Sequence, residues 1–429
     1  MPLPPFRFLA LALAASLPLA TTLTARPMWA QSAALTLYPI TAQGAIGDGT
    51  TLNTRSIQAT IDAAAAAGGG TVVVPTGIFQ TGALFLKQGV ALRVDRGGVL
   101  LGSDRLEDYL PAGVSVADRA YLPFALINAT DLAHVVVSGA GTIDGHGRRW
   151  WDEYWKLRNA KDPDLAFKTR RPRLLHFTSC RDLTLSGLEL CNEAVWCVHL
   201  QFCENVLAEN LNIHAAHDAP SSDGIDIDSS RHVRIAGCTF DVDDDDISIK
   251  AGHGGDPARV NRPSEDILIE HCHFAYGHGG IDIGSETFGG IRHVVAQDCT
   301  VDSGNLAAIR FKTTPARSGV VEDIVFRNIT MHHVRQALEI NMDWRSGTSR
   351  PEAPAQVPPV FRNFRLIHVT GDADSVGVFH GLATSPLTDV TFTDCAITAN
   401  KGLVLEHARS VSLAGLALTV KNGPAVTTR

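Results

Sequence analysis

Carboxyl groups gather in two short runs near the middle of this 429-residue chain. Residues 221–228 include Asp223, and residues 241–250 include Asp244 and Asp245 side by side. Carboxyl groups held close together cannot all ionise easily, so one of them is pushed to keep a proton near the working pH. Hydrolysis by acid–base catalysis can use such a protonated carboxyl group and a carboxylate that activates water on the opposite side of the reacting bond, roughly 6.5–9.5 Å apart. The spacing of these acids is therefore typical of acid–base chemistry.

Basic side chains follow further along the chain. His278 lies between two glycines, and Arg310 and Lys312 stand on either side of Phe311. Because side chains alternate along a strand, we expect Arg310 and Lys312 on one outward face, where they can bind a carboxylate. The whole chain carries a formal net charge of −8. An anionic ligand would therefore need a local group of cations such as this one.

A repeat of short strands must position these residues. Each copy has a polar residue, then apolar residues alternating with polar ones, then a polar pair or a glycine, and then a small apolar residue. The copies begin at His134, Asp182, Asn205, His232, Asp266, His293, Asp323, Asn363, Asp389 and Ser410. The shortest interval, 21 residues, suits one coil of three short strands, and longer intervals indicate inserted loops. We therefore predict an all-β fold, a right-handed parallel β-helix of about nine or ten coils.

Equivalent positions on successive coils of such a helix lie about 4.8 Å apart. Residues 221–228, 241–250, 277–284 and 308–313 fall on four consecutive coils of the predicted repeat. The acids, His278 and the two cations should therefore meet on one surface.

The front of the chain differs from the repeat. Residues 56–67 read as a helix that ends at a run of glycines, with Thr54 as its N-terminal cap. Apolar strands are expected at 72–74, 83–86 and 99–101. Because an open solenoid end must be covered, we expect the helix to cap the first coil.

The first thirty residues are typical of an export signal. Arg7 precedes an apolar run from Phe8 to Leu23 that is short for a membrane span. We expect residues 1–30 to be removed, with cleavage between 25 and 34, leaving 31–429 as a single catalytic domain that is secreted or periplasmic. Loss of Arg7 and Arg26 changes the net charge from −8 to −10. This charge argues against nucleic acid and anionic membrane as partners, and we expect a monomer.

Eight cysteines in an exported chain raise the question of disulfides. Cys238, Cys272, Cys299 and Cys395 share one position of the repeat with Leu, Ile and Val, so they are expected to be buried free thiols. Cys191 and Cys197 lie in a loop-like stretch where a disulfide is an open alternative. No C-x-x-C pair is present, so metal binding by cysteine is not expected.

The order of the polar motifs resembles glycoside hydrolase family 28, the polygalacturonases. Members carry Asn-Thr-Asp, Asp-Asp, Gly-His-Gly and Arg-Ile-Lys on adjacent coils. The matching positions are Asp223, Asp244 with Asp245, 277–279, and Arg310 with Lys312, and the likeness spans about 44–334. Three of the motifs depart from the family pattern: Ser221 and Ser222 stand before Asp223, Asp246 follows Asp245, and Phe311 lies between the cations.

The resemblance implies a secreted glycoside hydrolase that cleaves α-1,4-galacturonosyl linkages in pectin by inversion, without a cofactor or metal. Asp244 would be the general acid, Asp223 and Asp245 would position and deprotonate the water, and His278 would hydrogen-bond within the cluster. Arg310 and Lys312 would bind a sugar carboxylate. Asp226, Lys250 and Trp344 are further candidate substrate-binding residues.

Several alternatives stay open. The acidic runs could be a solvated loop or a Ca²⁺ site. The fold also suits a pectate lyase or a non-catalytic carbohydrate-binding β-helix, and the substrate could be rhamnogalacturonan or another substituted pectin. Aromatic residues at 150–155 could line one end of the cleft or only hold their loop on the solenoid. Loops at 145–171 and 251–264 could close the cleft, so internal and chain-end cleavage are both open.

Overall fold

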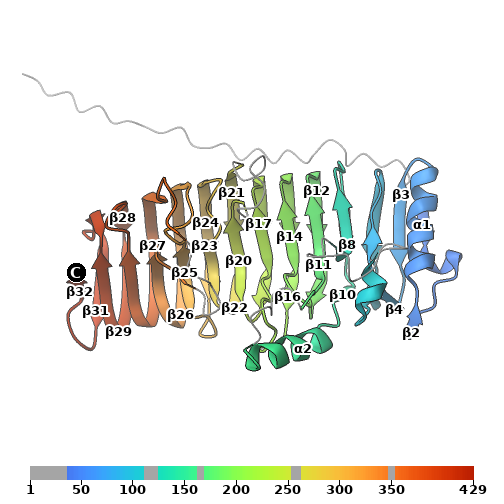
Figure 1. Ribbon diagram of the computed structural model, residues 1–429, viewed down its shortest axis with the longest axis horizontal. Helices are drawn as coiled ribbons and strands as arrows, with labels where there is room; N and C mark the ends of the chain where they lie inside the picture. The colour runs from blue at the N-terminus through green and yellow to red at the C-terminus, as the bar shows by residue number, and fades with distance from the viewer. Residues whose placement is uncertain (1–35, 111–123, 162–168, 253–261, 346–352) are drawn as a thin grey trace, which may run out of the picture. The chain divides into compact units, whose positions relative to one another are not determined.

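Short strands stack in three parallel series along the chain, and Figure 1 shows them side by side from α1 to the C-terminus. The computed structural model describes residues 36–110, 124–161, 169–252, 262–345 and 353–429. The predicted export signal and its cleavage region lie outside these residues, as do parts of the loops 145–171 and 251–264. Within the described residues, no helix is long and apolar enough to cross a membrane.

The first series begins each coil, and from β12 on its strands include the polar start of the repeat. Its members are β1 (Leu37–Pro39), β3 (Gly70–Val74), β6 (Val90–Val94), β9 (Val136–Gly139), β12 (Arg181–Ser186), β15 (Glu204–Glu209), β18 (Arg231–Ala236), β21 (Ser264–Glu270), β24 (Ile291–Val301), β26 (Val320–Asn341), β27 (Val360–His380), β28 (Leu387–Thr393) and β30 (Ala408–Ser412).

The second series follows a corner in every coil. It comprises β2 (Asp48–Leu52), β4 (Gly77–Thr81), β7 (Gly98–Gly102), β10 (Thr142–Asp144), β13 (Glu189–Cys191), β16 (Asn212–His214), β19 (Thr239–Asp241), β22 (His273–Tyr276), parts of β24, β26 and β27, β29 (Cys395–Glu406) and β31 (Leu416–Val420).

The third series carries the polar motifs. It comprises β5 (Leu84–Phe85), β8 (Ala125–Thr130), β11 (Arg173–Thr178), β14 (Val198–Gln201), β17 (Ile225–Asp228), β20 (Asp245–Lys250), β23 (Gly279–Gly284), β25 (Ala307–Lys312), the last parts of β26, β27 and β29, and β32 (Val426–Thr428).

The described strands form twelve coils that contribute to all three series, from β3–β5 to β30–β32. The parallel β-helix is therefore confirmed, but the predicted nine or ten coils are too few. The extra coils come first in the chain, where β3 to β8 lack the polar start of the repeat that the prediction counted.

The polar start has a conformational cause. All ten residues that begin a copy of the repeat have a positive φ, between 53° for His293 and Ser410 and 59° for Asp389. Left-handed backbone is costly for most residues and is tolerated best by Gly, Asn and Asp. The residue type at this corner therefore follows from the turn that each coil needs to enter the first series.

The core is a set of apolar ladders inside the solenoid. In the third series, Ile227, Ile249, Ile283 and Phe311 pair in register, and each is at least 98% buried. The residues between them point to the opposite face of the series, because side chains alternate along a strand. Burying each aliphatic side chain contributes roughly 1.5–3 kcal/mol, so this ladder fixes the register of the polar face.

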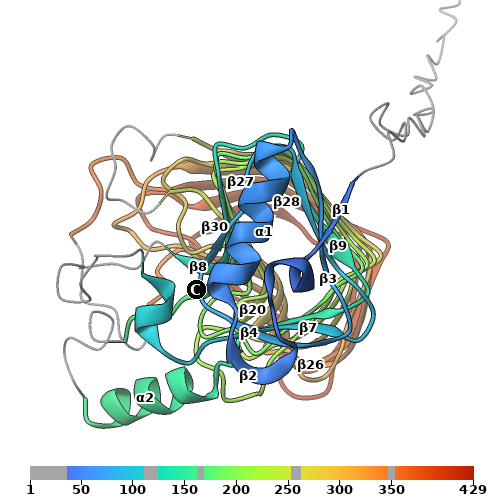
Figure 2. The same cartoon turned by 90° about the vertical axis from the view of Figure 1, so that its right-hand side faces the viewer.

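Two helices lie outside the coils. Helix α1 (Thr54–Ala66) packs against β1, β3, β5 and β6, and Figure 2 shows it across the first coils. Thr54 is the first helical residue and not the predicted cap; its hydroxyl oxygen accepts a hydrogen bond from the Gly82 N–H (2.7 Å). That α1 protects the solenoid end stays a prediction.

Helix α2 (Arg148–Asn159) is attached to the loops that follow β13 and β16. The Trp151 indole donates to the Glu193 carbonyl (3.0 Å), and the Trp155 indole donates to the Asp218 carbonyl (2.7 Å). Arg148 also binds both carboxylate oxygens of Asp218. The aromatic residues at 150–155 therefore hold this loop on the solenoid, as one of the two predicted alternatives stated.

All eight cysteines lie in the described residues, and all are free and buried. The expectation for Cys238, Cys272, Cys299 and Cys395 is confirmed, and each is at most 3% exposed. Cys191 and Cys197 form no disulfide in this structure. Burial raises the pKa of Cys197 far above its usual value, which keeps it a thiol.

Glu193 leads to a prediction about stability. Its carboxyl group is fully buried beneath α2, without a hydrogen-bond partner among the described residues, and burial raises its pKa to about 8. An unfolded glutamate loses its proton near pH 4.3, so the free energy of unfolding should fall by a few kcal/mol as pH rises from there to about 8. The Glu193→Gln variant lacks this loss and should melt higher than wild type at pH 8–9.

Thermal melts from pH 5 to pH 9 measure this effect. The two curves should nearly coincide at pH 5, where Glu193 is neutral. Glu209→Gln changes a half-buried glutamate on β15 and serves as the control. Parallel pH curves for wild type and Glu193→Gln would contradict a neutral Glu193.

Candidate active site

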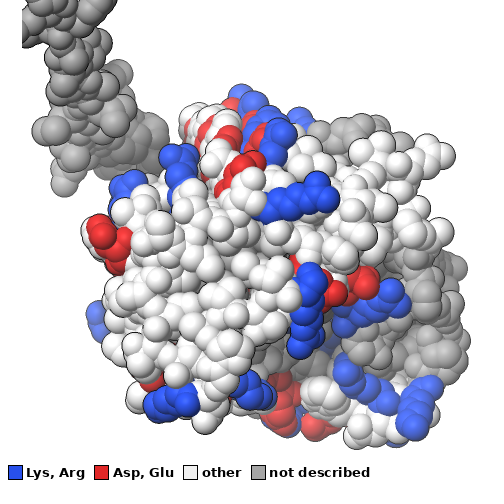
Figure 3. Space-filling view, turned by 90° about the vertical axis from the view of Figure 1, so that its left-hand side faces the viewer, with Lys and Arg blue, Asp and Glu red and all other residues white. Residues whose placement is uncertain are grey.

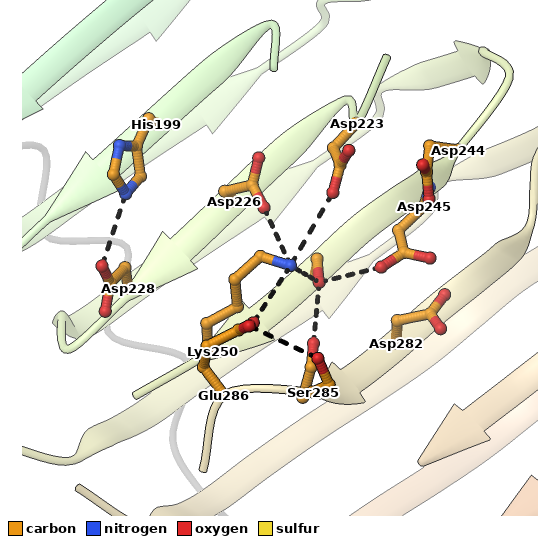
Figure 4. Close-up of polar contacts among 12 residues, drawn as sticks. His199, Asp223, Asp226, Asp228, Asp244, Asp245, Lys250, Asp282, Ser285 and Glu286 are labelled. Carbon is orange, nitrogen blue, oxygen red and sulfur yellow. Dashed lines mark hydrogen bonds and ion pairs between the residues drawn. The ribbon is translucent and has the colours of Figure 1, made fainter. Parts of the chain in front are cut away.

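Four adjacent strands of the third series, β17, β20, β23 and β25, carry the predicted site. Their register aligns Asp226, Ser248, Asp282 and Arg310 in one column beside the apolar ladder. Asp226, Ser248 and Asp282 are fully buried. The polar face is therefore a buried charged network, which Figure 4 shows around the Lys250 ammonium group.

The three predicted catalytic acids lie together. One carboxylate oxygen of Asp223, of Asp244 and of Asp245 can be chosen so that all three are within 4.8 Å of one another. Asp223 and Asp245 are buried, whereas Asp244 is partly exposed. This limit applies to one chosen oxygen of each group, and the separation of roughly 6.5–9.5 Å between acid and base stays a prediction. The register explains this proximity, because successive coils lie only about 4.8 Å apart.

Asp245 is the acid that is held as a carboxylate. The Lys312 ammonium donates to both of its oxygens, at 2.7 and 2.5 Å, and the Ser248 hydroxyl donates at 3.1 Å. Burial alone would raise the pKa of Asp245, but the charges of Lys312, Lys250 and Arg310 outweigh it and hold this pKa below its usual range. Asp245 is therefore ionised at the pH of any ordinary assay.

Asp223 and Asp226 differ from Asp245, because their pKa values are raised and not lowered. Lys250 lies 3.7 Å from Asp223, 3.3 Å from Asp226 and 3.8 Å from Glu286. Burial, reinforced by Asp226 and Asp244, raises the pKa of Asp223, and burial raises the pKa of Asp226 to about 7. One ammonium among three acids cannot keep all of them charged, so this side of the cluster retains protons.

The outer edge of the cluster is formed by Asp244 and His278. Their Oδ1 and Nδ1 atoms lie 3.2 Å apart, and the His278 backbone N–H donates to the Asp244 carbonyl (2.7 Å). Burial opposes protonation of His278, but the hydrogen bond with Asp244 and the charges of Asp244 and Asp245 raise its pKa. His278 therefore keeps its proton to a higher pH than usual, at the partly exposed edge of the cluster.

The predicted substrate cations have internal partners. Arg310 donates to Glu339 (2.8 Å), and both Arg310 and Lys312 lie near Asp282, at 3.8 and 3.3 Å. The Lys312 side chain is only 6% exposed, and that of Arg310 is 13% exposed. Their contact with a substrate carboxylate stays a prediction, and Lys312 has the least surface to offer.

Trp344, a further candidate substrate-binding residue, lies beside these cations. Its ring centroid is 5.9 Å from the Arg310 guanidinium carbon and 5.5 Å from the Lys312 nitrogen. The ring is half-buried, so it leaves an aromatic surface next to the charges. By contrast, Asp226 is fully buried and Lys250 is 5% exposed, so neither presents a free surface to a substrate.

The glycines beside His278 are required by close packing. A Cβ on Gly279 would lie 1.9 Å from an Asp282 oxygen, and a Cβ on Gly277 would lie 2.8 Å from an Asp246 oxygen. Asp246 itself is fully buried and has no hydrogen-bond partner among the described residues. Burial, together with Asp282 and Asp245, raises its pKa, so Asp246 is a neutral residue of the interior.

Three residues near the cluster were not predicted. Glu286 binds Lys250 and also Arg317 (3.2 Å). The Trp196 ring lies 5.2 Å from the Lys250 nitrogen, and Arg171 donates to the Ser221 hydroxyl (3.4 Å), two residues before Asp223. All three lie in loops between strands, where the repeat gives no register and the sequence therefore offers no positional signal.

The cations of the cluster favour acid–base chemistry over a Ca²⁺ site. Lys312 already occupies both oxygens of Asp245, and Lys250 lies beside Asp223. A divalent ion among the three acids would be repelled by both ammonium groups. Figure 3 draws the C-terminal end of the solenoid, where Lys, Arg, Asp and Glu side chains are scattered over a surface that is otherwise uncharged.

Known proteins resemble this chain over most of its length. Residues 72–411 match the family described as Glycosyl hydrolases family 28. The chain is 30% identical to an exo-poly-alpha-D-galacturonosidase of Dickeya chrysanthemi over 89% of this chain and 73% of that protein. It is 27% identical to an endo-polygalacturonase of Pectobacterium carotovorum subsp. carotovorum over 75% of this chain and 78% of that protein.

A solved structure of a hyperthermoactive exopolygalacturonase from Thermotoga maritima superposes with a TM-score of 0.69 at 26% identity. The superposition covers 92% of this chain and 91% of that one. The matched region of the family contains every predicted site residue, from Asp223 to Trp344. The four ordered motifs, the β-helix and the acid cluster together show that this chain belongs to glycoside hydrolase family 28.

Proposed function

We propose that this protein hydrolyses α-1,4-galacturonosyl linkages in pectin by a single displacement with inversion. The observation that carries the proposal is the difference between three neighbouring acids: Asp245 is held as a carboxylate by Lys312, Asp223 retains a proton, and Asp244 is paired with His278. Differently tuned neighbouring carboxyl groups are what acid–base hydrolysis needs.

In this proposal, Asp244 protonates the leaving oxygen, because it is the partly exposed member and His278 can replace its proton. Asp245 and Asp223 position the water, and Asp245 accepts its proton. The short separation of the acids would also suit a retaining enzyme. However, both Asp245 oxygens accept hydrogen bonds from Lys312, which makes this carboxylate a poor nucleophile, and Asp223 is protonated. Water is then the remaining nucleophile.

The anomer released first tests this proposal. Proton NMR at early times on polygalacturonate should show β-galacturonate at the new reducing end, because the substrate linkage is α. Release of α-galacturonate first would show a covalent intermediate and overturn the roles given to Asp223 and Asp245. Unsaturated products, detected by their ultraviolet absorbance, would instead indicate a lyase.

Asp226, Lys250 and Glu286 complete the proposal as positioning residues. Lys250 contacts Asp223, Asp226 and Glu286 at once, so it fixes where Asp223 lies. We also propose that residues 1–30 direct export, as their composition indicates. N-terminal sequencing of the secreted protein would test this, and an uncleaved Met1 in the medium would contradict it.

A further inference from the structure

Asp246 is a buried acid of β20 to which the proposed mechanism gives no role. It directly follows Asp245, the proposed base, and precedes the buried Ile247. Its side chain is fully buried, and neither carboxyl oxygen has a hydrogen-bond partner among the described residues. Buried polar groups are almost always paired, so an unpaired acid at this place calls for an explanation.

Close packing connects Asp246 to the turn that carries His278. A Cβ on Gly277 would lie 2.8 Å from the Asp246 Oδ1 atom and 2.9 Å from its Cγ atom. The same Cβ would lie 2.9 Å from the Asp244 carbonyl oxygen, which accepts a hydrogen bond from the His278 N–H (2.7 Å). The Asp246 carboxyl group therefore fills the space beside this turn, and a shift of either one displaces the other.

Burial and the surrounding charges both oppose ionisation of Asp246. Burial raises its pKa well above the usual value, and the acids Asp282 on β23, Asp245 on β20 and Asp241 on β19 raise it further. The Lys312 ammonium donates to both oxygens of Asp245 and lies 3.3 Å from Asp282, so its charge is already shared by two acids. Asp246 therefore holds its proton, whereas Asp245 beside it has lost its own.

We propose that Asp246 is a positioning residue whose neutral state keeps the base and the His278 turn in place, so that its ionisation sets an upper pH limit on activity. The inference rests on the proposed function, which makes Asp245 the base and Asp244 the general acid. An ionised Asp246 has to draw water into its site or leave the interior. Because its backbone continues into Asp245 and its carboxyl group packs against Gly277, either movement disturbs both sides of the catalytic cluster.

The pH profile of kcat/KM on polygalacturonate tests the inference. In wild type, kcat/KM should fall above a limiting pH, because Asp246 then loses its proton. Asp246→Asn has nearly the same shape and cannot ionise, so its fall should begin about one pH unit or more higher, which is roughly a 10-fold higher kcat/KM at a fixed pH on the wild-type fall. Below the limit, the two enzymes should agree within a few-fold. Asp246→Ser is a smaller neutral variant that should move the limit in the same direction, and it keeps the test valid if Asp246→Asn is unstable.

Asp302→Asn is the matched control. Asp302 follows β24, pairs with His273 at 2.7 Å and has a side chain that is 37% exposed, so it can ionise where it lies. Its loss should leave the pH limit unchanged. The inference is overturned if wild type and both Asp246 variants share one limit, because Asp244 or His278 would then set it. An equal shift in Asp302→Asn would also overturn it, by showing a general effect of charge.

Hydrogen–deuterium exchange gives a readout that does not depend on hydrolysis. Wild type and Asp246→Asn are compared at the same pH, from pH 5 to pH 9. At high pH, amides of residues 244–250 and 277–280 should exchange faster in wild type than in the variant, and at low pH the rates should agree. Amides of β15 should exchange alike in both proteins at every pH.

The two readouts separate the inference from the proposed function. Equal exchange at every pH, in a wild type that cleaves polygalacturonate, would overturn the inference and leave the proposed function standing. A wild type that shows the exchange difference but cleaves no polygalacturonate would overturn the proposed function and support the role of Asp246 in holding the cluster.

Discussion

Replacing Asp244 with asparagine should lower kcat on polygalacturonate by at least about 100-fold, the scale for a positioned general acid. Asparagine keeps the shape of the side chain but cannot deliver a proton to the leaving oxygen. The melting temperature should not fall, because the change removes one negative charge from a cluster where three acids lie within 4.8 Å.

A second readout connects this variant to His278. The hydrogen bond with Asp244 and the charge of Asp244 raise the pKa of His278 against the effect of burial. With asparagine in place, that support is lost, so NMR titration should show His278 losing its proton at a lower pH than in wild type. This titration tests the Asp244–His278 pairing, and kcat tests whether the pair acts in catalysis.

Asp241→Asn is the matched control. Asp241 belongs to the same acidic run but ends β19 in the second series, where it pairs with His217 (2.6 Å). Its loss should leave kcat within a few-fold of wild type. Near-normal turnover by a folded Asp244→Asn variant would remove Asp244 from the mechanism.

The fold could be predicted from sequence because one turn conformation recurs. The left-handed corner restricts residue type at every start from His134 to Ser410, and the ladder Ile227, Ile249, Ile283 restricts the face of the strands. Together these rules place the four polar runs on adjacent coils. In the coils before His134 this corner is occupied by Gly69 and Gly89, which have a positive φ but lack the polar side chain that marks the repeat. For this reason the predicted number of coils was too small.

The partners of the charged residues could not be predicted in the same way. Alternation correctly places Arg310 and Lys312 opposite Phe311, which is buried. It does not show how far a long side chain reaches. Lys312 crosses the whole coil of β23 to reach Asp245, over positions that pair with Gly284 and Gly279. A Cβ on Gly284 would meet the Lys312 carbonyl, and a Cβ on Gly279 would meet the Asp282 carboxylate, so neither position has room for a side chain. The Lys312 cation is internal to the cluster.

The loop residues illustrate a further limit. Lys250 is on a strand and was predicted at the site, but its neighbours Glu286 and Trp196 are not on strands of the repeat. The position of Lys250 in the repeat predicts a side chain that can bind a substrate. In the structure, acids and an aromatic ring enclose it. The chemistry of a predicted residue therefore depends on loops for which the repeat sets no register.

Replacing Lys312 with methionine should change the protonation of Asp245, the proposed base. Asp245 would lose the cation that contacts both its oxygens, and burial would then raise its pKa. A base must be deprotonated to act, so the acidic limb of kcat/KM should move to higher pH. At pH values below the shifted limb, kcat/KM of the variant should be about 100-fold or more lower than that of wild type. Part of this activity should return as the pH rises.

Substrate charge separates this role from direct binding of the polymer. If Lys312 mainly positions Asp245, the Lys312→Met variant should lose the same factor in kcat/KM on polygalacturonate and on methyl-esterified pectin. The Lys312→Arg variant should then recover part of the activity. If Lys312 mainly binds a sugar carboxylate, the loss should be larger on polygalacturonate and the pH limb should not move.

Because the variant leaves Asp245 and Asp282 buried without their ammonium partner, it should also be less stable, by on the order of 3–5 kcal/mol. Rates must therefore be measured below its melting temperature, where a shifted pH limb reports on folded protein alone.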